Sequence, residues 1–597
     1  MNAELLLAHF DRISDVPDAI PRLRQFILDL AIRGQLTPQD PNDEPGSELL
    51  KWIRMQKARM EEKGEIKKQE TLPVNKDEEP FAIPANWVWT RLGQIGDWGS
   101  GSTPSRGGND LFGGGIKWLK SGELNDNRQL ADSEETVTKL AISKGSFRQN
   151  QPGDVLIAMY GATIGKVAIL AEPAVTNQAV CGCTPFSGVS NLYLFNFLLS
   201  RRIQFHSASE GGAQPNISKI KILGFPLPLP PLAEQKRIVA KVDELMALCD
   251  RLKAVRTERE ARRDRLTAAS LHHLNNSVST PSFRERARFY INHLPTFTAG
   301  PRHIQQLRQT IFELAARGKL VEQNGKDEPA SELLERIREK RALLAKEGKT
   351  KPRMTLPSIP EDMEPFRLPV SWQWVRFDNL IEDSDAGWSP KSENFPRSGN
   401  NWGVLKVSAV SWDRFLPEEN KQLLPGIIPP QGTQVNAEDF LISRANTSEL
   451  VAKSVIVEEK PKNLILSDKI VRLRIAENCN KKFLSMINNH AAYARSYYAE
   501  EASGTSFSMK NVSRDVIYML PVPLAPLAEQ IRIVAKVDEL MCICDQLEVR
   551  LSYVDAQSRA LLEAVLHHAL SDPPESASPT RPLPQTDLLP SGIPSFH

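Results

Sequence analysis

The sequence predicts an α+β protein in which two sheet-rich globular bodies are separated by two long antiparallel coiled-coil helices. The elements should follow a pseudo-two-fold cyclic repeat. Residues 231–252 and 526–547 are two copies of one helical sequence that differ at four of 22 positions. Residues 23–36 and 307–320 are two copies of a second helical segment. Internal repetition of this kind indicates a duplicated architecture.

The first repeat predicts the long helices. Each copy begins with prolines and a glutamate, Glu234 or Glu529, at the end of a helix where the dipole favours an anion. Residues 533–565 place apolar side chains alternately four and three apart, which is the seam of a coiled coil. The first copy begins the same seam but places arginines on it from Arg256 onward, so this half should face something other than apolar side chains. Helices of about 40 residues would be about 60 Å long and could hold two bodies apart.

The repeats occur in an order that closes on itself. In the middle of the chain the long helix is followed by the short segment, whereas the termini carry the short segment first and the long helix last. We therefore expect the N-terminal segment to pack beside the C-terminal helix, as the two central pieces pack beside each other. The predicted divisions are a helical segment (1–80), a first body (81–229), a central helical region (230–356), a second body (357–524), a C-terminal long helix (525–570) and a disordered tail rich in proline and serine (571–597).

The two bodies begin alike and then diverge. Each opens with a pair of tryptophans, Trp87 with Trp89 and Trp372 with Trp374. Glycine, serine and asparagine then separate short runs of β-branched residues, such as GDVLIAMYG and ILSDKIVRLRI. Such runs predict the strands of a mixed sheet with long loops.

Composition limits the class of protein. At 597 residues the chain is too long for a single core, and its formal charge of +2 means that any nucleic-acid surface must come from local patches. Six cysteines form no disulfide framework, and the pairs Cys181/Cys183 and Cys542/Cys544 lack the further ligands of a zinc site. We expect them to act as small apolar residues in a reducing compartment. Because neither a signal peptide nor a membrane span is recognisable, we expect a cytoplasmic protein with no membrane partner.

No segment carries a complete catalytic motif. Residues 161–167 resemble a phosphate-binding loop, but they have one residue too few between the glycines and valine in place of serine or threonine, which favours a simple loop between strands. Residues 572–575 (DPPE) lack the aromatic residue of an amino-methyltransferase motif. The two histidine pairs are adjacent in sequence, so their rings do not face one another on a helix. The chain is therefore predicted to be non-catalytic and to bind no metal or cofactor itself.

Polar and basic loop residues remain as candidate DNA contacts. Lysine and arginine neutralise phosphates, while asparagine, glutamine and arginine can read base edges. By composition alone, such loops are also typical of ordinary solvated surface. The candidates in the first body are Ser102, Thr103, Ser105, Arg106, Lys117, Lys120, Tyr160, Thr163, Lys166, Asn177, Gln178, Gln214, Asn216, Ser218 and Lys219. The candidates in the second body are Ser389, Lys391, Lys406, Ser443, Arg444, Asn446, Thr447, Lys469, Lys510, Asn511, Ser513 and Arg514.

Several segments together resemble a known family. They are SGSTPSR, IKWLKSGEL, GDVLIAMYGATIGKVAIL, TNQAV, GGAQPNIS, and PLPPLAEQKRIVAKVD with its second copy. In combination they resemble the specificity subunit of type I restriction-modification systems. LRQFILDLAIRGQL and DEPGSELL resemble the subgroup with a conserved helical N-terminal segment. The second body departs from the pattern, because WSPKSENF replaces STPSRGG and LSDKI replaces TNQAV.

The resemblance implies that each body is a target recognition domain that reads one half of a bipartite, asymmetric sequence in double-stranded DNA. The long helices would fix the gap between the halves. Two methyltransferase subunits would dock on the conserved helices and bind S-adenosylmethionine, and two restriction or translocase subunits would bring ATP and Mg. Two alternatives remain open: a two-headed protein-binding scaffold without a DNA role, and a fused enzyme with a degenerate transferase site.

Overall fold

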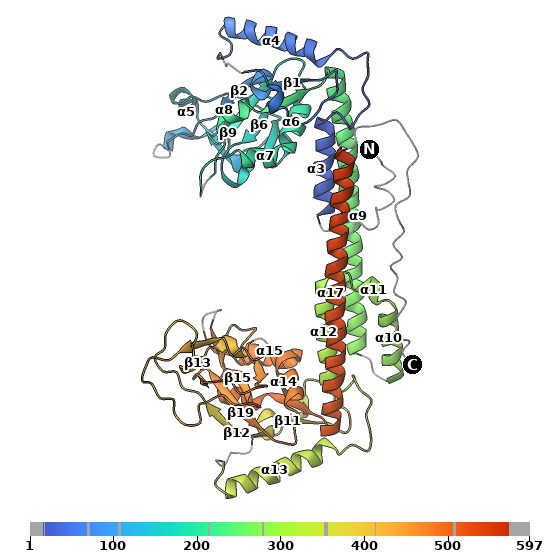
Figure 1. Cartoon of the computed structure of the whole chain (residues 1–597), viewed down its shortest axis with the longest axis vertical. Coiled ribbons are helices and arrows are strands. Elements are labelled where there is room, and N and C mark those ends of the chain that lie inside the picture. The colour runs from blue at the N-terminus through green and yellow to red at the C-terminus, as the bar shows by residue number, and fades with distance from the viewer. Residues whose placement is uncertain are drawn as a thin grey trace. The chain divides into compact units, whose positions relative to one another are not determined.

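The chain folds into two compact units. The computed structural model describes residues 16, 18–68, 72–105, 109–212, 215–276, 280–350, 356–411, 413–504 and 509–571, so almost all of the predicted tail lies outside the described residues. Unit 1 contains Met1–Arg259 and Asp555–His597, and unit 2 contains Glu260–Val554. Two long helices, α9 (Leu232–Asn275) and α17 (Leu527–Ser571), each continue from one unit into the other (Figure 1).

In unit 1 the N-terminal segment lies beside the end of the C-terminal helix. Helix α3 (Ala19–Ile32) packs next to both long helices in Figure 1. Val16 and Ala19 share an apolar cluster with Leu562 and Val565 of α17. The cyclic closure predicted from the order of the repeats is therefore present in this unit.

In unit 2 the second copy of the segment makes the equivalent junction. Helix α12 (Pro301–Ala316) places Arg308 2.6 Å from Asp545 of α17. In unit 1, Arg24 of α3 lies 2.5 Å from Asp250 of α9. Arg308 is the repeat counterpart of Arg24, and Asp545 is the repeat counterpart of Asp250. Each short helical segment therefore meets the first half of a long helix in the same way.

The second half of α9 also has its own partners in unit 2. Helices α10 (Thr280–Asn292) and α11 (Leu294–Phe297) follow it, and His303 of α12 lies 2.8 Å from Asp264 of α9. In unit 1, Arg256 of α9 donates to the carbonyl of Val16 at 2.6 Å. The arginine-rich half of the seam thus meets backbone as well as side chains. Unit 2 buries Leu271, Leu274, Tyr290 and Phe297 in one cluster.

The body of unit 1 holds two main sheets, with strand orders β2-β9-β6-β7-β4 and β5-β3-β8. Strands β6 and β7 are buried on both faces because alternate residues enter two different apolar clusters. The strands are β2 (Gly96–Ser100), β3 (Phe112–Leu119), β4 (Asn127–Leu130), β5 (Glu135–Val137), β6 (Val155–Ala158), β7 (Val167–Leu170), β8 (Val175–Thr176) and β9 (Val180–Pro185). The helices are α4 (Gly46–Glu62), α5 (Lys139–Lys144), α6 (Asn191–Ser200), α7 (Arg202–Ser207) and α8 (Lys219–Leu223).

The body of unit 2 has related sheets, with strand orders β12-β19-β15-β17, β14-β13-β18 and β16-β20. The strands are β12 (Ile381–Ala386), β13 (Gly403–Leu405), β14 (Asn420–Gln422), β15 (Phe440–Ser443), β16 (Ala445–Asn446), β17 (Ser454–Ile456), β18 (Leu464–Ile465), β19 (Ile470–Ile475) and β20 (Lys510–Asn511). The helices are α13 (Ala330–Lys346), α14 (Lys481–His490), α15 (Ala492–Glu501) and α16 (Arg514–Met519).

A two-stranded ladder ties the beginning of each body to its end. Strand β1 (Val88–Arg91) pairs antiparallel with β10 (Pro226–Leu229), and β11 (Gln373–Arg376) pairs with β21 (Pro521–Leu524). Strands β10 (PLPL) and β21 (PVPL) are rich in proline, which has no backbone N–H to donate. Each of them therefore pairs with a single strand, and both sheets stay two-stranded. Each tryptophan pair thereby lies next to the start of a long helix.

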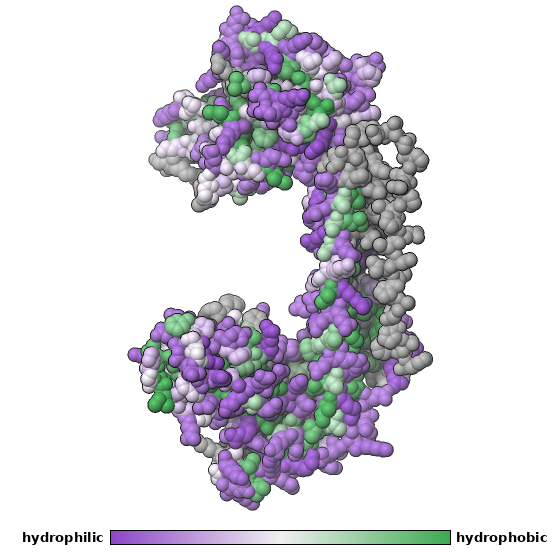
Figure 2. All heavy atoms as spheres, viewed as in Figure 1, coloured by the Kyte–Doolittle hydropathy of each residue, from purple (hydrophilic) through white to green (hydrophobic). Residues whose placement is uncertain are grey.

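The surface and the cysteines agree with the composition. The visible faces of both bodies are mainly hydrophilic with scattered hydrophobic residues (Figure 2). No helix among the described residues is long and apolar enough to span a bilayer.

All six cysteines are free, and burial raises the pKa of Cys181 to about 12. The described residues contain no cluster of histidine, cysteine and acidic side chains suited to a metal.

Candidate functional site

The predicted contact residues of unit 1 gather in the loops at one end of the strands of its larger sheet. Strands β2 and β6 both pair antiparallel with β9, so β2 and β6 end at the same side of the sheet where β9 begins. The loop after β2, the loop between β6 and β7, and the segment before β9 therefore meet there. We call this the loop edge of unit 1, and define it as residues 101–105, 159–166, 176–179 and 215–219.

Backbone hydrogen bonds hold these four segments together. Ser102 N donates to the Thr176 carbonyl at 2.8 Å, and Met159 N donates to the Ala179 carbonyl at 2.8 Å. Ile217 N donates to the Met159 carbonyl at 2.9 Å. Because these contacts are made by backbone groups, they fix the loops while leaving the side chains to vary.

A glycine allows the closest of these approaches. A Cβ on Gly101 would lie 1.9 Å from the Thr176 carbonyl oxygen, which is far inside contact distance. Any side chain at this position would therefore push the loop after β2 away from the segment before β9. The glycine in the SGSTPSR motif is explained by this crossing of two backbones.

Side chains of the loop edge are partly exposed and bond to one another. The Thr103 hydroxyl donates to the side-chain carbonyl of Gln178. Lys166 Nζ donates to Asn125 Oδ1 at 2.9 Å, which is a neutral partner. Tyr160 is 43% exposed, and an isolated β-bridge joins it to Asn216. The edge thus presents an aromatic ring, amides, hydroxyls and a lysine to solvent.

Unit 2 builds an equivalent loop edge from a different sequence. We define it as residues 387–391, 444–447, 466–469 and 509–514. Trp388 N donates to the Leu466 carbonyl at 2.8 Å, Arg444 N donates to the Lys469 carbonyl at 2.7 Å, and Val512 N donates to the Arg444 carbonyl at 2.9 Å. These are the counterparts of the three backbone bonds in unit 1.

The crossing of the two backbones is also repeated in unit 2. A Cβ on Gly387 would lie 2.2 Å from the Leu466 backbone. The side-chain contact has changed, however, because Ser389 donates to the carboxylate of Asp468 where unit 1 has a threonine and a glutamine. The two bodies therefore share a framework and differ in the groups that it presents.

The structure brings most of the predicted residues to the two loop edges. Arg106 and Gln214 lie outside the described residues, and Ser443 is fully buried, with its hydroxyl donating to the Leu450 carbonyl at 3.3 Å. Those at the edge of unit 1 are Ser102, Thr103, Ser105, Tyr160, Thr163, Lys166, Asn177, Gln178, Asn216, Ser218 and Lys219. Those at the edge of unit 2 are Ser389, Lys391, Arg444, Asn446, Thr447, Lys469, Lys510, Asn511, Ser513 and Arg514.

Three predicted lysines that lie outside the two loop edges have charges that are balanced within the chain. Lys117 of strand β3 lies 2.6 Å from Glu172, which follows strand β7. Lys120 lies 2.8 Å from Glu134, and this hydrogen bond raises the pKa of the lysine. The third of these pairs joins Lys406 to Glu419 at 3.4 Å. A paired lysine is a weaker phosphate contact than an unpaired one, since its charge is already partly neutralised.

An exposed carboxylate and an exposed indole of the second loop edge were absent from the prediction. Asp468 is exposed beside Ser389, and Trp388 is 37% exposed next to it. Residue type alone did not indicate them, because the predicted contact groups were cations, amides and hydroxyls. The alignment of LSDKI with TNQAV would have found Asp468, because it places this residue opposite Gln178.

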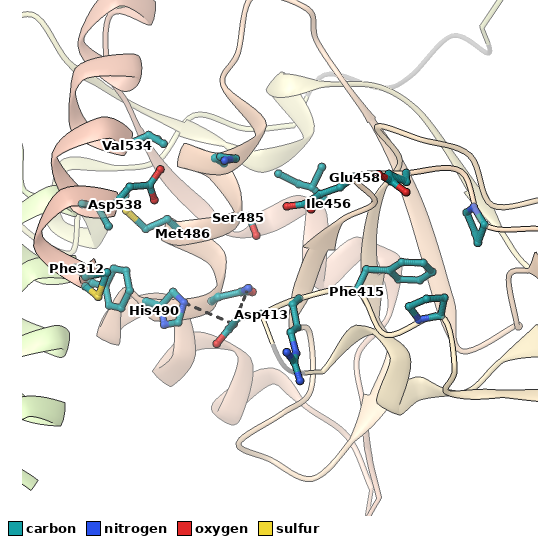
Figure 3. Close-up of a pocket in the computed structure, with 18 of the residues that line it drawn as sticks. Phe312, Asp413, Phe415, Ile456, Glu458, Ser485, Met486, His490, Val534 and Asp538 are labelled. Atoms are coloured by element: carbon teal, nitrogen blue, oxygen red, sulfur yellow. Dashed lines mark hydrogen bonds and ion pairs between the residues drawn. The ribbon is translucent and has the colours of Figure 1, made fainter. Parts of the chain in front are cut away.

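Unit 2 also contains a cavity of about 810 Å³ between α14, the first half of α17 and the loop around Asp413 (Figure 3). The His490 ring stacks on Phe312 with centroids 4.0 Å apart, and its Nε2 lies 3.5 Å from Asp413. Burial lowers the pKa of His490 to about 4, so the ring is neutral near pH 7. Acidic and basic side chains both line this space.

The corresponding place in unit 1 is filled by an arginine. Arg128 forms an ion pair with Asp243 of α9, donates to Asn196 at 3.1 Å and lies over the Phe195 ring. The repeat partner of Asp243 is Asp538, which lines the cavity of unit 2. The two bodies are therefore seated on their long helices with different side chains.

Comparisons with known proteins find relatives of this chain. A family model described as the type I restriction modification DNA specificity domain matches residues 84–260. The chain is 31% identical over 565 residues to the type I restriction enzyme EcoEI specificity subunit of Escherichia coli, covering 92% of this chain and 94% of that protein. It is 30% identical over 577 residues to the EcoAI specificity subunit of Escherichia coli, with the same coverage. The crystal structure of the HsdS subunit from Thermoanaerobacter tengcongensis covers 83% of this chain and 98% of its own, at 17% identity and a TM-score of 0.41.

Proposed function

We propose the following function for this chain, which belongs to the family of type I restriction enzyme specificity subunits. The chain is the DNA sequence-specificity subunit of a type I restriction-modification complex. Each body reads one half of a bipartite, asymmetric target in double-stranded DNA through its loop edge. The observation that carries this proposal is the pair of loop edges, in which one backbone framework presents two different sets of side chains.

The chemistry of the edges suits DNA. Lysine and arginine at the rim can neutralise phosphates, whereas amides, hydroxyls and a carboxylate can bond to base edges in the major groove. Because the net charge is only +2, these local groups and the partner subunits together supply the phosphate contacts.

The repeated helices are the docking surfaces for partners. The junctions of α3 with α9 and of α12 with α17 repeat the same contacts, which suits two copies of one partner. We assign these surfaces to two methyltransferase subunits, which carry S-adenosylmethionine and act on an adenine flipped out of each half-target. Two restriction or translocase subunits add ATP and Mg. This chain itself has no catalytic role, binds no cofactor and acts in the cytoplasm.

An exchange of one body tests the proposal. Replacing residues 81–229 with the first body of another specificity subunit should change one half of the methylated motif and leave the other half unchanged, as read by sequencing of methylated adenines in cells. If both halves changed together, or neither did, the bodies would not read the halves independently.

Two other functions would give different results. A protein-binding scaffold without a DNA role would leave the methylated motifs of the host unaltered when the chain is removed. A fused enzyme would transfer methyl groups from S-adenosylmethionine to DNA as a purified chain, without partner subunits.

A further inference from the structure

Gln178 and Asp468 occupy the same place in the two bodies. Each lies two residues before the strand that begins at the loop edge, β9 or β19. Each also accepts a hydrogen bond from a hydroxyl in the loop after the first strand of the sheet, Thr103 or Ser389. Both side chains are exposed.

The surroundings of these two residues are built alike although the sequences differ. Ser102 N bonds to the Thr176 carbonyl at 2.8 Å, and Trp388 N bonds to the Leu466 carbonyl at the same distance. The backbone therefore delivers the two side chains from equivalent positions. What differs is the hydrogen-bonding group, which is an amide in one body and a carboxylate in the other.

The Gln178 amide suits adenine. Thr103 uses one lone pair of the side-chain carbonyl, and this contact orients the amide. A second lone pair and the NH₂ group can still accept and donate. In the major groove, adenine presents an N7 acceptor beside an N6 donor, which is the complementary pattern.

The Asp468 carboxylate suits cytosine. Ionised carboxylates only accept hydrogen bonds, and close to DNA phosphates they are repelled unless they meet a donor. Cytosine presents its N4 amino group as a donor in the major groove. Lys469 Nζ lies 3.6 Å from Asp468 Oδ2 and offsets part of the repulsion.

We propose that Gln178 reads an adenine in one half-target and that Asp468 reads a cytosine in the other. Thr103 and Ser389 are positioning residues that hold these side chains toward the DNA. The inference rests on the proposed function, and it names the base and the reader at one position of each half-target.

The test uses the full chain assembled with its methyltransferase subunit. The methylated motif is first determined for the wild-type complex. Binding is then measured to duplexes in which one base pair of that motif is replaced at a time. The variants are Gln178→Ala, Asp468→Asn and Ser389→Ala, and the matched control is Glu332→Gln, an exposed acid on α13 of the same unit that lies outside the loop edge.

Asp468→Asn should lower the preference for cytosine at one position by tenfold or more and leave the other half-target unchanged. Gln178→Ala should do the same to an adenine of the other half. Ser389→Ala should keep the cytosine preference but weaken it, with no change in the thermal unfolding midpoint. Glu332→Gln should behave as the wild type.

The inference is overturned if Asp468→Asn retains the full cytosine preference, or if it weakens binding equally at every position. A motif without a cytosine in the half-target of the second body would also overturn it while leaving the proposed function intact. A wild-type complex that methylates no bipartite motif would remove the proposed function and this inference together. If Asp468→Asn does not fold, the Ser389→Ala and Gln178→Ala results decide.

Discussion

Trp87 donates its indole hydrogen to Glu234 at 2.8 Å, and Gln39 donates to the same carboxylate at 2.5 Å. Glu234 is completely buried in the first turn of α9. One carboxylate thus joins the first body and the N-terminal helical segment to the long helix. In unit 2, Gln323 donates to Glu529 at 2.5 Å, so the repeat preserves the glutamine bond of this joint.

Replacing Glu234 with alanine should destabilise unit 1 by about 1–3 kcal/mol, because the buried indole N–H of Trp87 loses its acceptor and the exposed Gln39 loses its partner. Urea unfolding followed by tryptophan fluorescence would measure the loss. Lys236→Ala is the matched control, since this residue is exposed on the same turn and should change stability by less than about 0.5 kcal/mol. Equal effects of the two substitutions would contradict the assigned role of the carboxylate.

Gly101→Ala should displace the loop after β2, because the new Cβ would meet the Thr176 carbonyl. We expect DNA binding by the assembled complex to fall at least about tenfold, since the loop edge would lose its geometry. Gly122→Ala provides the control, because a Cβ there meets nothing within 4 Å. Normal DNA binding by Gly101→Ala would show that this crossing does not shape the interface.

Lys166→Ala should reduce the dependence of DNA affinity on salt. Each phosphate contact that is lost lowers the slope of log affinity against log salt by about 0.9. Lys120→Ala should change the slope less, because its charge is already paired with Glu134 and Glu135. Titrations of a fluorescent duplex at several salt concentrations would separate the two variants, and identical slopes would argue against Lys166 as a phosphate contact.

Lengthening both long helices should lengthen the spacer, which is the stretch of DNA of any sequence between the two recognised half-targets. The boundary between the units falls after Arg259 in α9 and after Val554 in α17, and these positions are related by the repeat. Seven residues inserted at both points add about 10 Å, or about three base pairs. An insertion in α9 alone should instead weaken the complex, because the two helices would differ in length. An unchanged spacer after the double insertion would exclude these helices as its ruler.

His490 should make unit 2 sensitive to acid. Its folded pKa of about 4 lies below the value of about 6.5 for an unfolded histidine, so the unfolded chain takes up the proton first. Its stabilising effect is present above pH 6.5 and is lost progressively as the pH falls toward 4. His490→Asn should reduce the loss of unfolding free energy between pH 7 and pH 5 by on the order of 2 kcal/mol.

Urea unfolding at the two pH values would measure this difference. The exposed His293 supplies the control, and His293→Asn should leave the pH dependence of the wild type unchanged. A His490→Asn protein that loses as much stability in acid as the wild type would assign the acid sensitivity to other groups.

Much of the architecture followed from repetition. The two copies of the long helix, the two copies of the short segment and their cyclic order predicted the junction in which Val16 packs with Leu562. This is possible because a repeated apolar pattern must find a repeated partner. One departure lies at the end of the predicted 533–565 seam, where the off-seam Leu562 is fully buried while the seam residue Leu561 is only partly buried against the same cluster.

The candidate site was predicted less completely. Residue types found Gln178 but passed over Asp468, and they included the fully buried Ser443 and the paired Lys117. Exposure and pairing depend on which segments cross, and the crossing of Gly101 over Thr176 joins residues far apart in the chain. Composition carries no record of such contacts.

The sequence by itself determined the duplicated helices, the two unlike bodies and the family, because helical periodicity and repeated segments are properties of the chain alone. Only the tertiary structure decided that each of the unlike bodies builds a loop edge on the same backbone framework, with Gln178 and Asp468 at equivalent points. The reason is physical: the edge is held by backbone hydrogen bonds, which do not depend on side-chain identity, so sequences can diverge while the loops still meet.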